Sequence, residues 1–117
     1  MNKALTVTCA SALFTALLTG SASNASAYAP CGTTASDRDG TSHPTATVTA
    51  NIRTGSSTSC TAVGSLLRGH RANYYCYTVN FDSTYTWTYL RDVDTGKTGW
   101  VRDDLLPGGG SVVYCGF

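Results

Sequence analysis

Residues 95–106 read TGKTGWVRDDLL, and this stretch decides the fold. It begins within a turn signal, DTGK at 94–97, that separates two segments in which apolar and polar residues alternate. This pattern predicts a β-hairpin with one strand over residues 84–93 and its partner over 98–102. The DDLL that follows fits a single helical turn, because an Asp can cap it, and the PGGG beyond it breaks the chain.

Other segments outside the hairpin carry strand signals. ATVTANIR at 46–53 and RANYYCYTV at 71–79 alternate and each predict a half-buried strand. A short apolar piece at 63–67 lies between them, and SVVYC at 111–115 predicts a last short strand. No segment keeps a helical period over more than one turn. Several short strands separated by turns predict an all-β domain, either a small barrel or a sandwich.

The N-terminal segment has the features of an export signal. Residues 1–27 begin with Lys3, continue with a mostly apolar run and end in the small residues Ala25-Ser26-Ala27. This order predicts a secretory signal peptide that is cleaved before Tyr28, with no membrane anchor left after cleavage. The remaining chain has 117 − 27 = 90 residues, enough for one domain. We divide it into an irregular N-terminal arm at 28–45, the β-domain at 46–106 and a C-terminal tail at 107–117.

The cysteine count changes once the signal peptide is removed. Of five cysteines, Cys9 leaves with the signal, and four remain in a short exported chain. An even number in this setting predicts two disulfides, whereas a zinc site would need a C-x-x-C spacing that is absent. We expect Cys60 to pair with Cys76 inside the domain, and Cys31 with Cys115 to tie the arm to the tail. The sequence leaves the other two connectivities open.

Charge and motif content exclude several classes of function. Removing Lys3 from the eight basic residues leaves seven, against seven acidic residues, so the formal net charge is zero. Without a basic stripe, nucleic acid is not an expected partner. No nucleophile elbow occurs, the cysteines are expected to be oxidised, and the faint calcium-loop pattern at 92–96 has no closing Glu. The sequence predicts a monomer that is not an enzyme and holds no metal or cofactor.

Three motifs, in the right order, resemble bacterial SH3 (SH3b) domains. NIRTGSSTS resembles their N-x-R-[ST]-G-P-S-[TS] opening, and SLLRGH their step of two apolar residues, a basic residue and Gly. WTYLRD…TGKTGWVRDDLL resembles their W-x-x-[VL]…G-x-x-GW[VI]…L ending. The match runs from about Ala46 to Leu106; Ser56 replaces the usual Pro, and the cysteines and the tail are extra. The resemblance implies a disulfide-stapled SH3-like β-barrel of five to six short antiparallel strands with one short 3-10 turn, in which Leu105 plugs one end.

Strand alternation sorts the aromatic residues by face. Tyr74 shares a face with Ala72 and Cys76, so we expect it in the core. Five other aromatic residues lie on the face of their strand that is opposite to the expected core residues of that strand. We expect these residues to point outward and to form a ligand surface: Tyr75, Tyr77, Trp87, Tyr89 and Trp100. The alternative is that the arm and the tail cover these rings.

Arg53 closes the first strand and is a candidate contact for a peptide carboxylate. The alternative is a structural salt bridge from Arg53 to Asp92 or Asp104. The resemblance implies a secreted or cell-wall-associated binding module for peptidoglycan peptides. The competing hypothesis is a secreted protein-interaction factor or protease inhibitor that contacts an exported protein through the loop at 54–60. A self-assembling surface protein is a third possibility.

Overall fold

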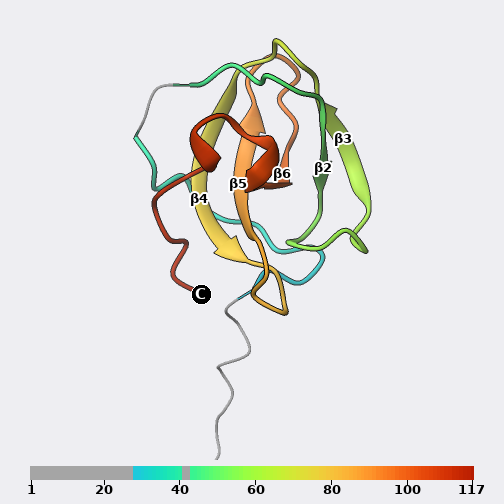
Figure 1. The fold of residues 1–117 in the computed structure, drawn as a ribbon, viewed down its shortest axis with the longest axis vertical. Helices are drawn as coiled ribbons and strands as arrows, with labels where there is room; N and C mark the ends of the chain where they lie inside the picture. The colour runs from blue at the N-terminus through green and yellow to red at the C-terminus, as the bar shows by residue number, and fades with distance from the viewer. Residues whose placement is uncertain (1–27, 41–42) are drawn as a thin grey trace, which may run out of the picture.

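The computed structural model describes residues 28–40 and 43–117. The predicted signal peptide, residues 1–27, lies outside the described residues. Five strands form one antiparallel sheet in the order β3-β2-β6-β5-β4 (Figure 1). Their bounds are Ala50–Arg53 for β2, Ala62–Leu66 for β3, Ala72–Val79 for β4, Thr86–Asp92 for β5 and Thr98–Arg102 for β6. The prediction of an all-β chain with short antiparallel strands is therefore confirmed.

The sheet curls around a core but stays open. Within the described part of the chain, no ladder pairs β3 with β4, the two edge strands. Two short 3-10 turns, η2 at Asp103–Leu105 and η3 at Pro107–Gly109, follow β6, where the sequence predicted one.

The predicted hairpin is β5–β6, and its glycine before Trp100 has a steric reason. β6 has the predicted bounds and pairs antiparallel with β2 at Arg53 and Trp100. A Cβ atom on Gly99 would lie 2.6 Å from the backbone oxygen of Arg53 and 2.6 Å from Cγ2 of Ile52. Only glycine lets the two strands approach this closely, so the GW pair in TGKTGW joins the hairpin to the rest of the sheet.

The inner face of the curled sheet holds an aliphatic core. Leu106 belongs to this core, whereas Leu105 is half-buried and packs against it. Leu105 thus contacts the core, as expected, but from a half-buried position, and the neighbouring Leu106 is the buried core member. Tyr74 is buried as predicted and donates a hydrogen bond from its hydroxyl to the carbonyl of Pro107. The buried members of the core are Ala46, Ala50, Ile52, Leu66, Ala72, Tyr74, Leu90, Val101 and Leu106.

The outer face of β4, β5 and β6 carries a second buried cluster. Trp87, Tyr89 and Trp100 are only 3%, 6% and 0% exposed, so the prediction that they lie outward on an open surface is wrong. Strand alternation placed their side chains on the correct face, but the arm and the tail cover that face, as the alternative interpretation stated. The buried members of this cluster are Ala29, Cys76, Trp87, Tyr89, Trp100 and Cys115.

A β-bulge explains why one cysteine lies on the unexpected face. Tyr74 pairs with Leu90 and Cys76 pairs with Tyr89, so the ladder between β4 and β5 shifts around Tyr75. The extra residue interrupts the alternation and moves Cys76 from the face of Tyr74 into the outer cluster. The prediction that Cys76 and Tyr74 share a face is therefore wrong.

The disulfides join Cys31 to Cys60 and Cys76 to Cys115, so the expected pairing is also wrong. Backbone hydrogen bonds hold the paired segments together. Gly32 donates to the carbonyl of Thr54, and the N–H of Thr54 donates to the carbonyl of Thr61, next to Cys60; the Cα atoms of Cys31 and Cys60 lie 5.4 Å apart. The N–H of Cys115 donates to the carbonyl of Tyr77, next to Cys76, and these two cysteine Cα atoms lie 4.9 Å apart.

The two disulfides indicate an oxidising, extracellular setting. Among residues 28–40 and 43–117, no helix is long and apolar enough to cross a membrane.

The tail is fixed by polar contacts and does not form the strand predicted at 111–115. It makes a single parallel bridge from Tyr114 to Tyr77. Ser111 donates from its hydroxyl to Asp39 and from its N–H to Thr88, at 2.7 and 2.9 Å. Thr88 in turn donates to Asp103, whose pKa is raised to about 6 by burial, in spite of hydrogen bonds that lower it. This buried polar cluster holds the tail against β5.

Candidate functional site

A groove opens between two loops on one side of the sheet. It consists of two adjoining hollows of about 290 and 200 Å³ that share Thr58, Trp87 and Arg102. The first is lined in addition by Ser57, Asn80, Phe81, Asp82, Thr84 and Tyr85, and the second by Asn51, Arg53 and Leu105. We call these two hollows together the groove.

Trp87 lines both hollows, and its indole N–H is exceptional. In the described part of the chain, Nε1 of Trp87 is the one buried side-chain nitrogen or oxygen without a hydrogen-bond partner. The other tryptophan, Trp100, donates from Nε1 to the carbonyl of Thr33 at 2.8 Å. Buried polar groups are nearly always paired, and leaving one unpaired costs about 1–3 kcal/mol. Trp87 therefore carries, beside the groove that its side chain lines, one buried donor that the described part of the chain does not satisfy.

The loop at 54–60 forms one wall and is fixed to the arm. Ser56 is fully buried; its hydroxyl donates to the carbonyl of Val79 at 2.8 Å and accepts from the N–H of Ala29 at 2.9 Å. The disulfide between Cys31 and Cys60 holds the end of the same loop. These contacts fix the wall that carries Ser57 and Thr58.

The loop at 80–85 forms the opposite wall and is closed by its own side chains. Oδ1 of Asn80 accepts the N–H groups of Thr84 and Tyr85, at 2.9 and 3.1 Å. Hydrogen bonds from Thr84 lower the pKa of Asp82, so this carboxylate is ionised at neutral pH. Phe81 is 75% exposed and Tyr85 is 46% exposed. This wall thus offers two accessible rings beside an acidic group.

The guanidinium group of Arg102 lies between the loops. Its Nε donates to Asp104 at 2.7 Å, and its Cζ lies 4.5 Å from the ring centre of Tyr85. The hydrogen bond with Asp104 raises the pKa of Arg102 further, so the group stays charged. Cross-strand pairing puts Arg102 directly opposite Trp87, which explains why both line the same groove.

Of the six predicted site residues, the structure brings Trp87 and Arg53 together in the groove. Trp100 is instead part of the packing beneath the arm, and Tyr89 lines a separate hollow beside Thr33. Half-buried Tyr75 packs against Tyr89, with the rings tilted relative to each other and their centres 5.5 Å apart.

Tyr77 is also half-buried, and its ring centre lies 5.6 Å from that of Tyr114. It therefore packs against the tail and does not line the groove that Trp87 lines.

Arg53 does not form the structural salt bridge weighed as its alternative role. Its Nη1 donates to the carbonyl of Cys60 at 2.9 Å. Asp92 is paired with His70, and Asp104 with Arg102. The side chain of Arg53 is thus held by one backbone contact at the edge of the groove.

Most of the residues that line the groove were missed by the sequence reasoning, among them the two rings and the cation that give it its character: Phe81, Tyr85 and Arg102. Phe81 carried a usable signal, since an aromatic ring in a polar loop has no core to enter. Tyr85 lies in the predicted strand 84–93, on the same face as Trp87 and Tyr89 by the two-residue period. Arg102 carried none, because its place opposite Trp87 depends on the exact register of the hairpin.

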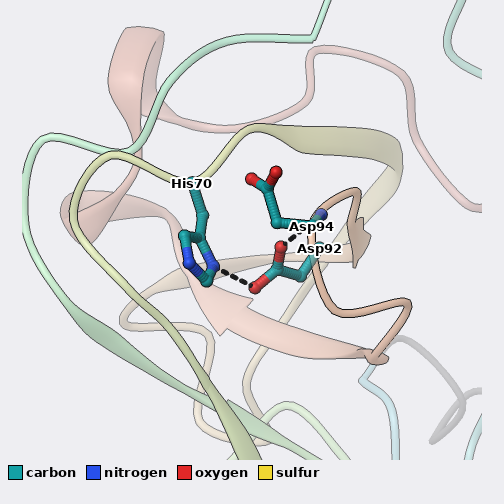
Figure 2. Close-up of side chains that lie close together, drawn as sticks. All are labelled: His70, Asp92 and Asp94. Atoms are coloured by element: carbon teal, nitrogen blue, oxygen red, sulfur yellow. Dashed lines mark hydrogen bonds and ion pairs between the residues drawn. The ribbon is translucent and has the colours of Figure 1, made fainter.

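A second group of titratable side chains lies at the far end of the hairpin. Figure 2 shows His70, Asp92 and Asp94, whose ligand atoms all lie within 4.8 Å of one another. Nδ1 of His70 is 2.8 Å from Oδ2 of Asp92, while Oδ1 of Asp92 accepts the N–H groups of Asp94 and Thr95. Asp94 accepts the N–H of Arg71 at 3.1 Å. These bonds tie the β5–β6 turn to the start of β4, so the cluster braces the hairpin.

Comparison with protein-family models, with curated proteins and with solved structures finds no match for this chain.

Proposed function

We propose that this protein is an exported, non-catalytic binding module that recognises peptidoglycan peptides in the groove. We also propose that its curled sheet is an SH3-like barrel of the SH3b kind. Two features support the barrel: the order of the three sequence motifs, and a five-stranded antiparallel sheet with a 3-10 turn directly after the last strand. The two disulfides support export.

The unpaired indole N–H of Trp87 is the observation that carries the binding proposal. Nε1 is inaccessible in the ligand-free structure, so the indole has to turn toward the groove when a ligand enters. A ligand carbonyl or carboxylate then supplies the missing acceptor, and the cost of burying the donor is recovered. The exposed rings of Phe81 and Tyr85 offer apolar contact, and the polar groups of both loops offer hydrogen bonds. A peptide, with an acceptor at every residue and apolar surface between, suits this combination.

Sedimentation of the oxidised protein with purified sacculi tests the proposal. We expect the parent protein to sediment and Trp87→Phe, which keeps a ring but lacks the N–H, to bind about tenfold more weakly. Phe81→Ala removes an exposed ring of the groove and should also weaken binding, whereas Val112→Ala, equally exposed but outside the groove, should not. Failure of the folded parent protein to sediment would reject peptidoglycan as the ligand and favour an exported protein partner.

A further inference from the structure

We propose that the end of the groove between Arg53 and Arg102 binds a carboxylate group of the ligand. This inference rests on the proposed function, because it assigns the chemistry that selects a peptide within the same groove. Arg53 ends β2 and Arg102 ends β6, so two different strands deliver guanidinium groups to one hollow. No acidic residue lines that hollow; its other lining residues are Asn51, Thr58, Trp87 and Leu105.

Each guanidinium group is positioned by the chain and keeps donors free. Arg53 uses Nη1 for the carbonyl of Cys60, and Arg102 uses Nε for Asp104. No other hydrogen bond engages either guanidinium group within residues 28–40 and 43–117. The guanidinium group of Arg102 also lies over the ring of Tyr85, with Cζ 4.5 Å from the ring centre, and this contact helps to hold it in place. Groups that are held in place in advance lose little conformational freedom when they bind a carboxylate through paired N–H···O bonds.

The charges favour an anion at this end of the groove. Among the described residues, Arg53 has no acidic partner. Asp104, the partner of Arg102, has a side chain that is 48% exposed, and it accepts a hydrogen bond from Nε of Arg102. Two guanidinium groups and one carboxylate leave the hollow with a net positive charge. Asp82 lines the opposite end, where its lowered pKa keeps it ionised. The hollow with Arg53 is therefore the basic part of the groove, whereas the hollow with Asp82 has one charged residue of each sign in its lining. This asymmetry orients a peptide with its carboxylate toward Arg53.

A matched pair of probes tests the assignment. One probe is a soluble cell-wall stem peptide with all carboxylates free, and the other is the same peptide with all carboxylates converted to carboxamides. We expect the oxidised parent protein to bind the free acid at least about tenfold more tightly than the amide, as measured by isothermal titration calorimetry. Arg53→Gln and Arg102→Gln should each reduce this preference to about threefold or less. Arg68→Gln, an exposed arginine outside the groove, should keep it.

Arg53 also supports the loop through Cys60, so Arg53→Lys serves as a second variant. It keeps the charge but loses the paired donors, and it should show an intermediate preference. Equal binding of acid and amide by the parent protein would overturn the carboxylate assignment and leave the groove as a peptide site. Loss of affinity for both probes in equal measure in the arginine variants would also overturn it. If neither probe binds to the folded parent protein, the proposed function is rejected together with this inference.

Discussion

Replacing Cys76 and Cys115 together by Ala is expected to lower the free energy of unfolding by about 4 kcal/mol. The two residues are separated by 39 positions. Without the disulfide, the unfolded chain regains the conformational entropy that closing a loop of this length removes, and this entropy corresponds to about 4 kcal/mol. This is a large part of the roughly 5–15 kcal/mol that holds a small domain folded. The same change also releases the tail from the cluster around Trp100, because Cys115 and Phe117 pack there. Urea denaturation of the oxidised parent and variant proteins measures the difference.

A mismatched double variant distinguishes the observed connectivity from the one expected from the sequence. Cys60→Ala with Cys76→Ala removes one cysteine from each observed disulfide. We expect two free thiols, on Cys31 and Cys115, and a loss of roughly 7 kcal/mol or more, which leaves the chain largely unfolded. If this variant instead had no free thiol and lost only as much stability as the matched variant, the observed pairing would be incorrect.

Asp92→Ala is expected to lower the free energy of unfolding by about 3 kcal/mol at neutral pH. Asp92 is fully buried, and its removal leaves His70 and the N–H groups of Asp94 and Thr95 without their acceptor. Asp94→Ala is the matched control from the same turn. Asp94 is exposed and accepts one N–H, so its loss should cost about 1 kcal/mol or less.

The effect of Asp92 should depend on pH in one direction. Burial alone would raise the pKa of Asp92. Hydrogen bonds with His70, with the N–H of Asp94 and with Thr95, together with the charge of His70, outweigh burial and lower the pKa below 3.8. A carboxyl with a lowered pKa stabilises the folded state above its unfolded pKa, and this stabilisation is lost as the pH falls through the folded pKa. The difference between parent and Asp92→Ala should therefore shrink below about pH 4. A difference that stays constant down to about pH 2 would show that the ionised carboxylate is not the stabilising form.

β4, β5 and β6 were predictable because their sequences show the two-residue period of a half-buried strand. Of the strand predicted at 46–53, only Ala50–Arg53 forms, as β2. β6 has the predicted bounds, and β4 begins one residue inside the predicted segment 71–79. The same period placed Trp87, Tyr89 and Trp100 on the correct face. It could not show that distant segments cover this face, because the contacts of Ala29 and Cys115 with these rings are long-range.

The parts that were not predictable depend on single insertions and on register. One bulged residue near Tyr75 moved Cys76 to the other face, and no sequence signal marks it. A turn confined to 94–97 would place Trp87 opposite Asp104, whereas the observed ladder places it opposite Arg102. The groove depends on this register, so its Arg102 side could not be predicted from spacing alone.

The indole N–H resonances of the ¹⁵N-labelled oxidised protein test the central claim most directly. The chain has two tryptophans, and Trp100 already donates to Thr33 while Trp87 has no partner. On titration with soluble muropeptides, we expect the Nε1–H resonance of Trp87 to move downfield as it gains an acceptor, while that of Trp100 stays in place. If binding shifts other resonances and leaves that of Trp87 unchanged, the groove is not the binding site.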